Sequence, residues 1–126
     1  MKKFGFFDQM DGDLARETLK RETSSTALPD ESAIVSYLSH GTMVAAVAGP
    51  AIDLLSEDES LIDPPHIFTD GEWIWSGDVR HYVEKYHLRV PDEFKNRMSE
   101  VGWIPPKVVD IPSLREMYWE DAIAVD

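Results

Sequence analysis

The chain of 126 residues contains no cysteine. Disulfide bonds, thiolate metal sites and a cysteine nucleophile are therefore excluded, and nothing in the composition requires an oxidising compartment. No stretch approaches the ~20 consecutive apolar residues of a membrane-spanning helix. The apolar run after Lys2 and Lys3 ends at Asp8 and is too short for a signal peptide. We therefore expect a cytoplasmic protein with no membrane partner.

Basic residues are missing from the whole middle of the chain. Between Arg21 and Arg80 there is no lysine or arginine. The acids of this interval are Glu22, Asp30, Glu31, Asp53, Glu57, Asp58, Glu59, Asp63, Asp70, Glu72 and Asp78. They account for nearly all of the net charge of −12. Such a field repels a phosphate backbone and attracts a basic protein, so we expect no nucleic-acid partner. The alternative is that these acids only keep a small protein soluble.

The length and a hydrophobic fraction of 43% predict one globular domain over residues 1–126. Asp11 or Asp13 is placed to cap a helix that ends near Glu22. Pro29 opens a second helix, for which Gly41 would be the C-terminal cap. The further elements expected are a short strand at residues 3–7, a buried strand at 42–48, a helix from 91 to 101, an edge strand at 108–109 and a helix at 114–122.

The clearest local signal is Asp70-Gly71 between two apolar segments. This dipeptide favours a two-residue type I′ turn. The turn predicts the pairs Thr69–Glu72, Phe68–Trp73, Ile67–Ile74 and His66–Trp75. Both faces of this hairpin carry large apolar groups, so we expect both to be covered.

A helix follows the hairpin almost at once. Its apolar positions Val79, Tyr82, Val83, Tyr86 and His87 have the spacing of one buried face. The sequence as a whole therefore predicts an α+β fold, in which a small antiparallel sheet with a central Asp-Gly hairpin is packed by about four to five helices.

No motif in the chain points to a particular chemistry. His81 and His87 lack the i, i+4 spacing of a metal clip, and we place His81 on the exposed side of the helix and His87 in a partly buried, hydrogen-bonded position. The acids of residues 8–13 do not follow the spacing of a calcium loop. There is no phosphate-binding glycine loop and no nucleophile motif. We expect no metal, no cofactor and no catalytic residue, and an enzymatic function is the less favoured hypothesis.

Aromatic residues gather around the hairpin and the next helix. Trp73, Trp75, Tyr82, Tyr86 and His87 are the candidates for lining a ligand pocket. Aromatic residues at these spacings more often form a core. A small-ligand-binding or enzymatic domain that uses this aromatic pocket is the alternative hypothesis for function.

The segment from Asp70 to Phe94 follows the pattern DGxWxWxxDxxxYVxxYHxxxPxxF. Together with residues 37–42, it resembles a family of small uncharacterised bacterial proteins, often actinobacterial, over about half of the chain. The resemblance implies a shared fold and no chemistry.

The favoured hypothesis is a non-enzymatic acidic interaction protein. The expected partner surface is acidic and consists of Glu57, Asp58, Glu59 and Asp63. Its partner would be a basic protein, and an immunity-type protein that neutralises a bacterial toxin is one function of this kind, by analogy of size and charge. Both a monomer and a homodimer are compatible with the sequence.

Overall fold

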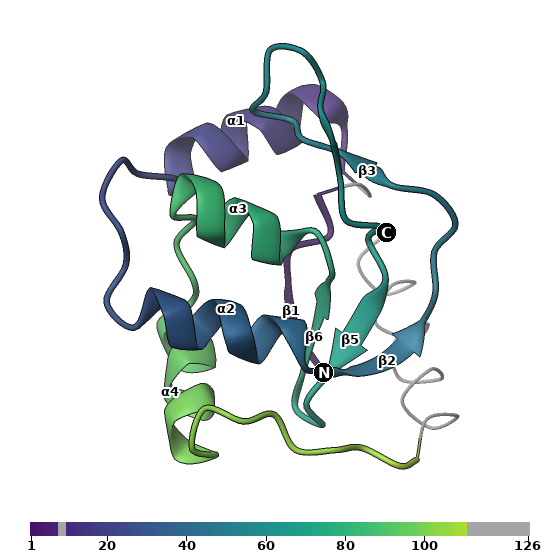
Figure 1. The fold of residues 1–126 in the computed structure, drawn as a ribbon, viewed down its shortest axis with the longest axis vertical. Coiled ribbons are helices and arrows are strands. Elements are labelled where there is room, and N and C mark those ends of the chain that lie inside the picture. Colours follow the sequence, from purple (N-terminus) through teal and green to yellow (C-terminus); the bar gives the residue numbers. More distant parts are fainter. Residues whose placement is uncertain (8–9, 111–126) are drawn as a thin grey trace.

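The computed structural model describes residues 1–7 and 10–110, and it has an α+β fold. Within these residues there are four helices and six strands (Figure 1). The main sheet has the order β1-β6-β5-β2, and β3 and β4 form a separate pair. The expected helix at 114–122 lies outside the described residues. None of the described helices is both long and apolar enough to cross a bilayer.

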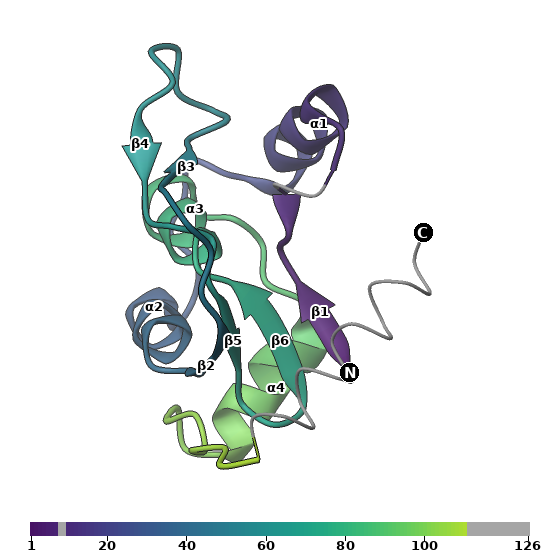
Figure 2. The ribbon, with the colours of Figure 1, turned by 90° about the vertical axis from the view of Figure 1, so that its right-hand side faces the viewer.

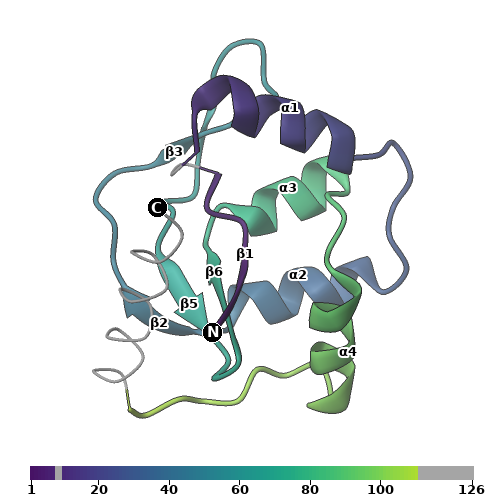
Figure 3. The same cartoon turned by 180° about the vertical axis from the view of Figure 1, so that it is seen from behind.

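The main sheet is mixed rather than antiparallel. Its strands are β1 (Lys2–Phe4), β2 (Thr42–Ala45), β5 (Ile67–Thr69) and β6 (Trp73–Ser76). β5 pairs antiparallel with both β2 and β6, but β1 runs parallel to β6, beside which it lies in the view from behind (Figure 3). The prediction of an antiparallel sheet was wrong in this strand, because a pairing between residues so far apart in sequence leaves no local signal.

The β5–β6 hairpin has a longer turn than the sequence predicted. Thr69 pairs with Ile74 and Phe68 with Trp75, so four residues, 70–73, separate the paired positions, and the last of these four, Trp73, also begins β6. The Asp70 carboxylate accepts the backbone N–H groups of Glu72 and Trp73, at 2.9 and 2.7 Å. These bonds stabilise an Asx-type turn in place of the two-residue turn. The pairing is displaced by two residues, an even number, so each side chain stays on its predicted face.

The four helices begin and end close to the predicted positions. They are α1 (Gly12–Glu22), α2 (Glu31–Ser39), α3 (Val79–Tyr86) and α4 (Asp92–Glu100). Asp11 is the N-cap of α1, where its carboxylate accepts the N–H groups of Asp13 and Leu14. Helices α2 and α3 pack side by side on one side of the main sheet (Figures 1 and 2).

Both faces of the hairpin are covered, as expected. On the helical side Trp73 stacks on Phe94 of α4, with ring centroids 4.5 Å apart. On the other face Ile67 and Ile74 form a smaller cluster with Phe6 and Val44. Gly41 directly follows His40, the C-cap of α2, but it lacks the positive φ of a capping glycine. A Cβ atom at Gly41 would lie 2.4 Å from the ring of Trp75, so the glycine allows the close approach of this core side chain.

The expected buried strand at 42–48 is shorter and lies at the edge of the sheet. Only residues 42–45 form β2, in which Val44 is buried but Met43 is 45% exposed. An edge strand of a sheet has one free side, which explains this exposure. The expected strand at 108–109 does not form, although the N–H of Val108 donates to the Thr42 hydroxyl at 3.0 Å.

Candidate functional site

The predicted acidic residues lie on the small hairpin of β3 (Ala51–Ile52) and β4 (Leu61–Ile62). The side chains of Glu57, Asp58 and Glu59 are exposed in the loop between the two strands. We call these three residues the acidic tip. The loop projects at the end of the molecule opposite α4 (Figures 1 and 2), so the tip is accessible.

The loop that carries the tip is internally hydrogen-bonded. Asp58 accepts hydrogen bonds from the hydroxyls of Ser56 and Ser60, the latter at 2.6 Å. These bonds lower the pKa of the Asp58 carboxyl, which favours its charged form. The N–H of Asp53 donates to the carbonyl of Ser60 at 2.8 Å and closes the base of the loop. The acidic tip is therefore carried on a loop with a defined conformation.

A buried carboxylate fixes this hairpin to α3. Asp53 has no exposed surface, and its Oδ2 lies 2.8 Å from Nε2 of His81 and 2.8 Å from the hydroxyl of Tyr86. Its Oδ1 accepts the N–H of Leu55 at 2.9 Å. Burial raises the pKa of Asp53, but the hydrogen bonds from His81, Tyr86 and Leu55 outweigh it, and the pKa lies below its ordinary value. Asp53 is therefore a charged anchor.

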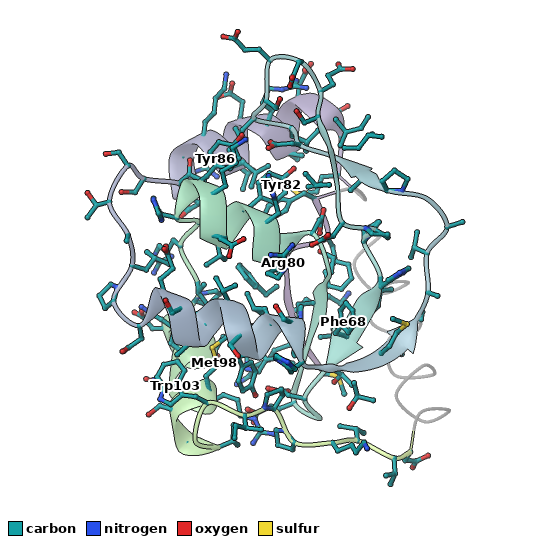
Figure 4. The ribbon with its side chains drawn as sticks, in the orientation of Figure 1. Phe68, Arg80, Tyr82, Tyr86, Met98 and Trp103 are labelled. Atoms are coloured by element: carbon teal, nitrogen blue, oxygen red, sulfur yellow. The ribbon has the colours of Figure 1, made fainter. Side chains whose placement is uncertain are left out.

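Tyr82 holds the same hairpin through backbone groups. Its hydroxyl donates to the carbonyl of Ile52 at 3.2 Å and accepts the N–H of Leu54 at 3.0 Å. Burial raises the pKa of Tyr82 to about 12, so the phenol stays protonated and keeps both bonds. Figure 4 shows Tyr82 and Tyr86 together on α3, on the side where the hairpin lies. Together with Asp53, these bonds fix the hairpin at several points along α3.

The structure corrects the placement of His81. We expected this side chain on the exposed side of α3, but it is four-fifths covered and bonded to Asp53. A buried acid attracts the nearest cationic or donor groups, and this contact draws the imidazole under the hairpin. One sequence signal could have found Asp53: it is a single acid inside the apolar run Ala51 to Leu55.

The fourth predicted acid of the partner surface behaves differently from the tip. Asp63 follows β4 and forms an ion pair with Arg80 of α3, which also bonds Glu84 at 3.1 Å. Its charge is thus partly neutralised within the chain. The partner surface expected from the sequence is therefore divided into a charged tip and a paired base.

The residues predicted to line an aromatic pocket separate in the structure. Trp73 and Trp75 belong to the core, with 4% and 0% of their surface exposed. Tyr82 and Tyr86 meet beneath the hairpin, as described above. His87 lies apart from these four, at the C-terminal end of α3, where its Nδ1 lies 2.6 Å from Oε1 of Glu31. It is partly buried and hydrogen-bonded, as expected.

Two clefts border the region around the hairpin and α3. One, of about 240 Å³, lies where β5 and α3 meet and is lined by His66, Phe68 and Arg80, among others. Arg80 and Phe68 border it in Figure 4. The other, of about 280 Å³, lies between α3 and the β3–β4 hairpin. Neither contains the predicted tryptophans. Within the described residues, no group of three or more histidine or acidic side chains is arranged to hold a metal ion.

Comparisons of the chain with protein families, with curated proteins and with solved structures give no match. Function is therefore inferred from the geometry of the acidic hairpin and its surroundings.

Proposed function

We propose that this protein is a non-enzymatic interaction protein that binds a basic partner protein through the acidic tip. The observation that carries the proposal is the contrast between the tip and three other acids of the lysine- and arginine-free interval. Asp53, Asp63 and Asp70 are each paired with basic groups of the chain itself. No lysine or arginine in the described part of the chain pairs with Glu57, Asp58 or Glu59.

The tip has the charge and the position that steer association. Charges of one sign on a projecting loop raise the encounter rate with an oppositely charged protein, and the effect falls with ionic strength. Because Asp53 and Tyr82 fix the hairpin to α3, less conformational freedom is lost on binding. These properties support an interaction that is fast, specific in position and sensitive to salt.

Apolar side chains adjoin the tip on the same hairpin. Leu61 of β4 is 69% exposed and Ile52 of β3 is 45% exposed. Interfaces between proteins combine a desolvated apolar centre with a polar rim. The hairpin offers both, which supports a protein partner over a simple polycation. A basic toxin, such as a nuclease, is a partner of this class, and an acidic immunity-type protein would cover its phosphate-binding surface.

The test compares two variants of equal net charge. The first replaces the tip by lysines (Glu57→Lys, Asp58→Lys, Glu59→Lys), and the control replaces three exposed acids elsewhere (Glu17→Lys, Glu100→Lys, Asp110→Lys). The association rate with a fluorescent polylysine peptide of about 20 residues is measured at low and at physiological salt. We expect reversal of the tip to slow association by about tenfold or more, and the control to slow it about twofold.

Equal slowing by the two variants would contradict the proposal, since it would mean that only the net charge matters. Binding of wild-type protein that is unaffected by salt would contradict it as well. Circular dichroism and thermal melting of both variants establish that each has kept its fold.

A further inference from the structure

The β3–β4 hairpin has one covered edge and one open edge. The N–H of Asp53 donates to the carbonyl of Ser60 at 2.8 Å, and Ile52 is the partner of Leu61 in the register. Hydrogen-bonded and non-hydrogen-bonded positions alternate along an antiparallel pair of strands. Ile52 and Leu61 therefore form a non-hydrogen-bonded pair, and the backbone N–H and C=O groups of each point outward, away from the other strand.

The outer edge of β3 is covered by α3. The carbonyl of Ile52 accepts a hydrogen bond from the hydroxyl of Tyr82 at 3.2 Å, and the same hydroxyl oxygen accepts the N–H of Leu54 at 3.0 Å. These bonds confirm that Ile52 directs its carbonyl away from β4, as the alternation requires. Because Tyr82 occupies this edge, a further strand has no place beside β3.

The outer edge of β4 is open. In the described part of the chain, β4 pairs with β3 alone, and no other described segment makes a hydrogen bond to the backbone of Leu61. The side chain of Leu61 is 69% exposed. In Figure 2, β4 lies at the periphery of the molecule, on the outer side of β3. An exposed strand edge with a free N–H and C=O can pair with an extended segment of another chain.

The surroundings of Leu61 indicate which side chains such a segment would carry. Ile52 and Leu61 lie opposite each other, so their exposed apolar side chains share one face of the hairpin. Acids lie at both ends of β4: Glu59 of the acidic tip is two residues before Leu61, and Asp63 is two residues after it. Residues two apart in a strand share a face. The matching segment therefore has an apolar residue with a basic residue two positions away on either side.

We propose that an extended segment of the basic partner adds to β4 as the third strand of this small sheet. Its main chain bonds to the N–H and C=O of Leu61, and its apolar side chain packs against Leu61 and Ile52. Its basic side chains face the acidic tip and Asp63. β4 has only two residues, so the added strand is short and depends on the tip for much of its affinity. This inference rests on the proposed function and adds to it the conformation and residue pattern of the partner.

The first experiment uses the peptide acetyl-Gly-Lys-Thr-Val-Thr-Lys-Gly-amide, which has this pattern. Two isomers carry one N-methyl group, either on the valine or on the threonine that follows it. Successive N–H groups of a strand point to opposite sides, so only one isomer loses a bond to Leu61. Each Kd is measured at low salt from the NMR shifts of the protein amides. We expect the two values to differ by about tenfold. Weaker binding of the methylvaline isomer indicates an antiparallel strand, and of the methylthreonine isomer a parallel one.

Two variants at one position locate the pairing on the protein. Leu61→Pro and Leu61→Ala both remove the leucine side chain, but only proline also removes the outward N–H. Proline is tolerated in an edge strand where the N–H faces solvent. We expect Leu61→Pro to bind the unmethylated peptide about tenfold more weakly than Leu61→Ala does. Should Leu61→Pro fail to form the hairpin, the two methylated isomers, tested on the wild-type protein, decide the question.

Equal Kd values for the two isomers, or equal binding by folded Leu61→Pro and Leu61→Ala, would overturn the addition of a strand to β4. The proposed function would survive that result if reversal of the acidic tip still slowed association with polylysine more than its control does. If the isomers differ but reversal of the tip has no specific effect, the open edge of β4 is a site for extended peptides and the proposed function fails.

Discussion

Asp53 and Asp70 are two fully covered carboxylates with similar chemistry and different positions. Asp70 lies in the turn of the β5–β6 hairpin, where its Oδ2 accepts the hydroxyl of Tyr37 at 2.6 Å and lies 3.5 Å from Nε of Arg97. It therefore joins the central hairpin to both α2 and α4. Asp53 joins the peripheral β3–β4 hairpin to α3 only.

The difference between the two regions lies in what surrounds each carboxylate. The turn at Asp70 continues into the core strand β6, in which every residue is buried. The hairpin at Asp53 has strands of two residues each, with exposed Leu61 and Ile52. A buried acid therefore stabilises the whole domain in one place and positions a surface loop in the other. The same interaction can stabilise the core or position a surface loop, according to what it connects.

Replacement of Asp70 should have the largest effect. Asp70→Ala removes the carboxylate that pairs with Arg97 and that accepts the Tyr37 hydroxyl and two N–H groups of the turn, and the loss of one partner of a buried pair costs about 3–5 kcal/mol. The free energy of unfolding, measured in urea, should fall by that amount. The control is Glu72→Ala, which removes the exposed partner of the same arginine and should cost less than about 1 kcal/mol. Similar losses in the two variants would contradict a special role for Asp70.

Replacement of Asp53 should have a smaller and more local effect. Asp53→Ala removes the acceptor shared by His81, Tyr86 and Leu55, and we expect a loss of about 1–3 kcal/mol. Hydrogen exchange should accelerate at the backbone amide of residue 53, which bonds to the carbonyl of Ser60, and stay slow at Ile74 in the core. Association with polylysine should also slow, because the tip is no longer held in place. Unchanged exchange in the hairpin would mean that Asp53 is not its anchor.

The contrast also shows which parts of the fold a sequence can reveal. The Asp-Gly signal placed the central hairpin and its two faces correctly, because alternation along a strand is a local property. The register was wrong because the decisive bonds come from the Asp70 side chain to the turn, and an aspartate in this position fits either turn. The parallel pairing of Lys2 with Trp73 depends on tertiary packing alone.

The charge of the candidate site was predictable, but the contact that anchors it was not. Three consecutive acids beside a proline-containing loop indicate an exposed surface, and Glu57, Asp58 and Glu59 are exposed. Of the five side chains expected to line a pocket, Trp73, Trp75 and Tyr82 are buried, and the spacing of these aromatic residues is equally typical of a core. The contact between Asp53 and His81 joins residues that are distant in sequence, so no local sequence pattern predicts it.

The pH dependence of stability should separate the anchor from the rest of the hairpin. The pKa of Asp53 is lower in the folded protein than its ordinary value of about 4. Its contribution is therefore fully present above pH ~4 and is lost as the pH falls through the folded pKa. In urea titrations below pH 4, the difference in stability between wild type and Asp53→Ala should shrink. A difference that stays constant down to pH ~2 would show that Asp53 does not contribute as a carboxylate.

The smallest expected effect is the loss of one hydrogen bond to the anchor. Tyr86→Phe removes the phenol that donates to Asp53 and leaves the contacts with His81 and Leu55, so we expect a cost of about 0.5–1.5 kcal/mol. Burial and the bond to Asp53 raise the pKa of Tyr86, so the phenol remains a donor at neutral pH.

The same substitution in the Asp53→Ala background completes a double-mutant cycle. In that background the Tyr86 hydroxyl has no carboxylate to donate to, and removal of the hydroxyl should cost almost nothing. An equal cost in both backgrounds would show that the Tyr86 hydroxyl contributes to stability independently of Asp53. A cost found only when Asp53 is present would mean that the hairpin is held by a hydrogen-bond network. In that network each donor stabilises the charged carboxylate of Asp53.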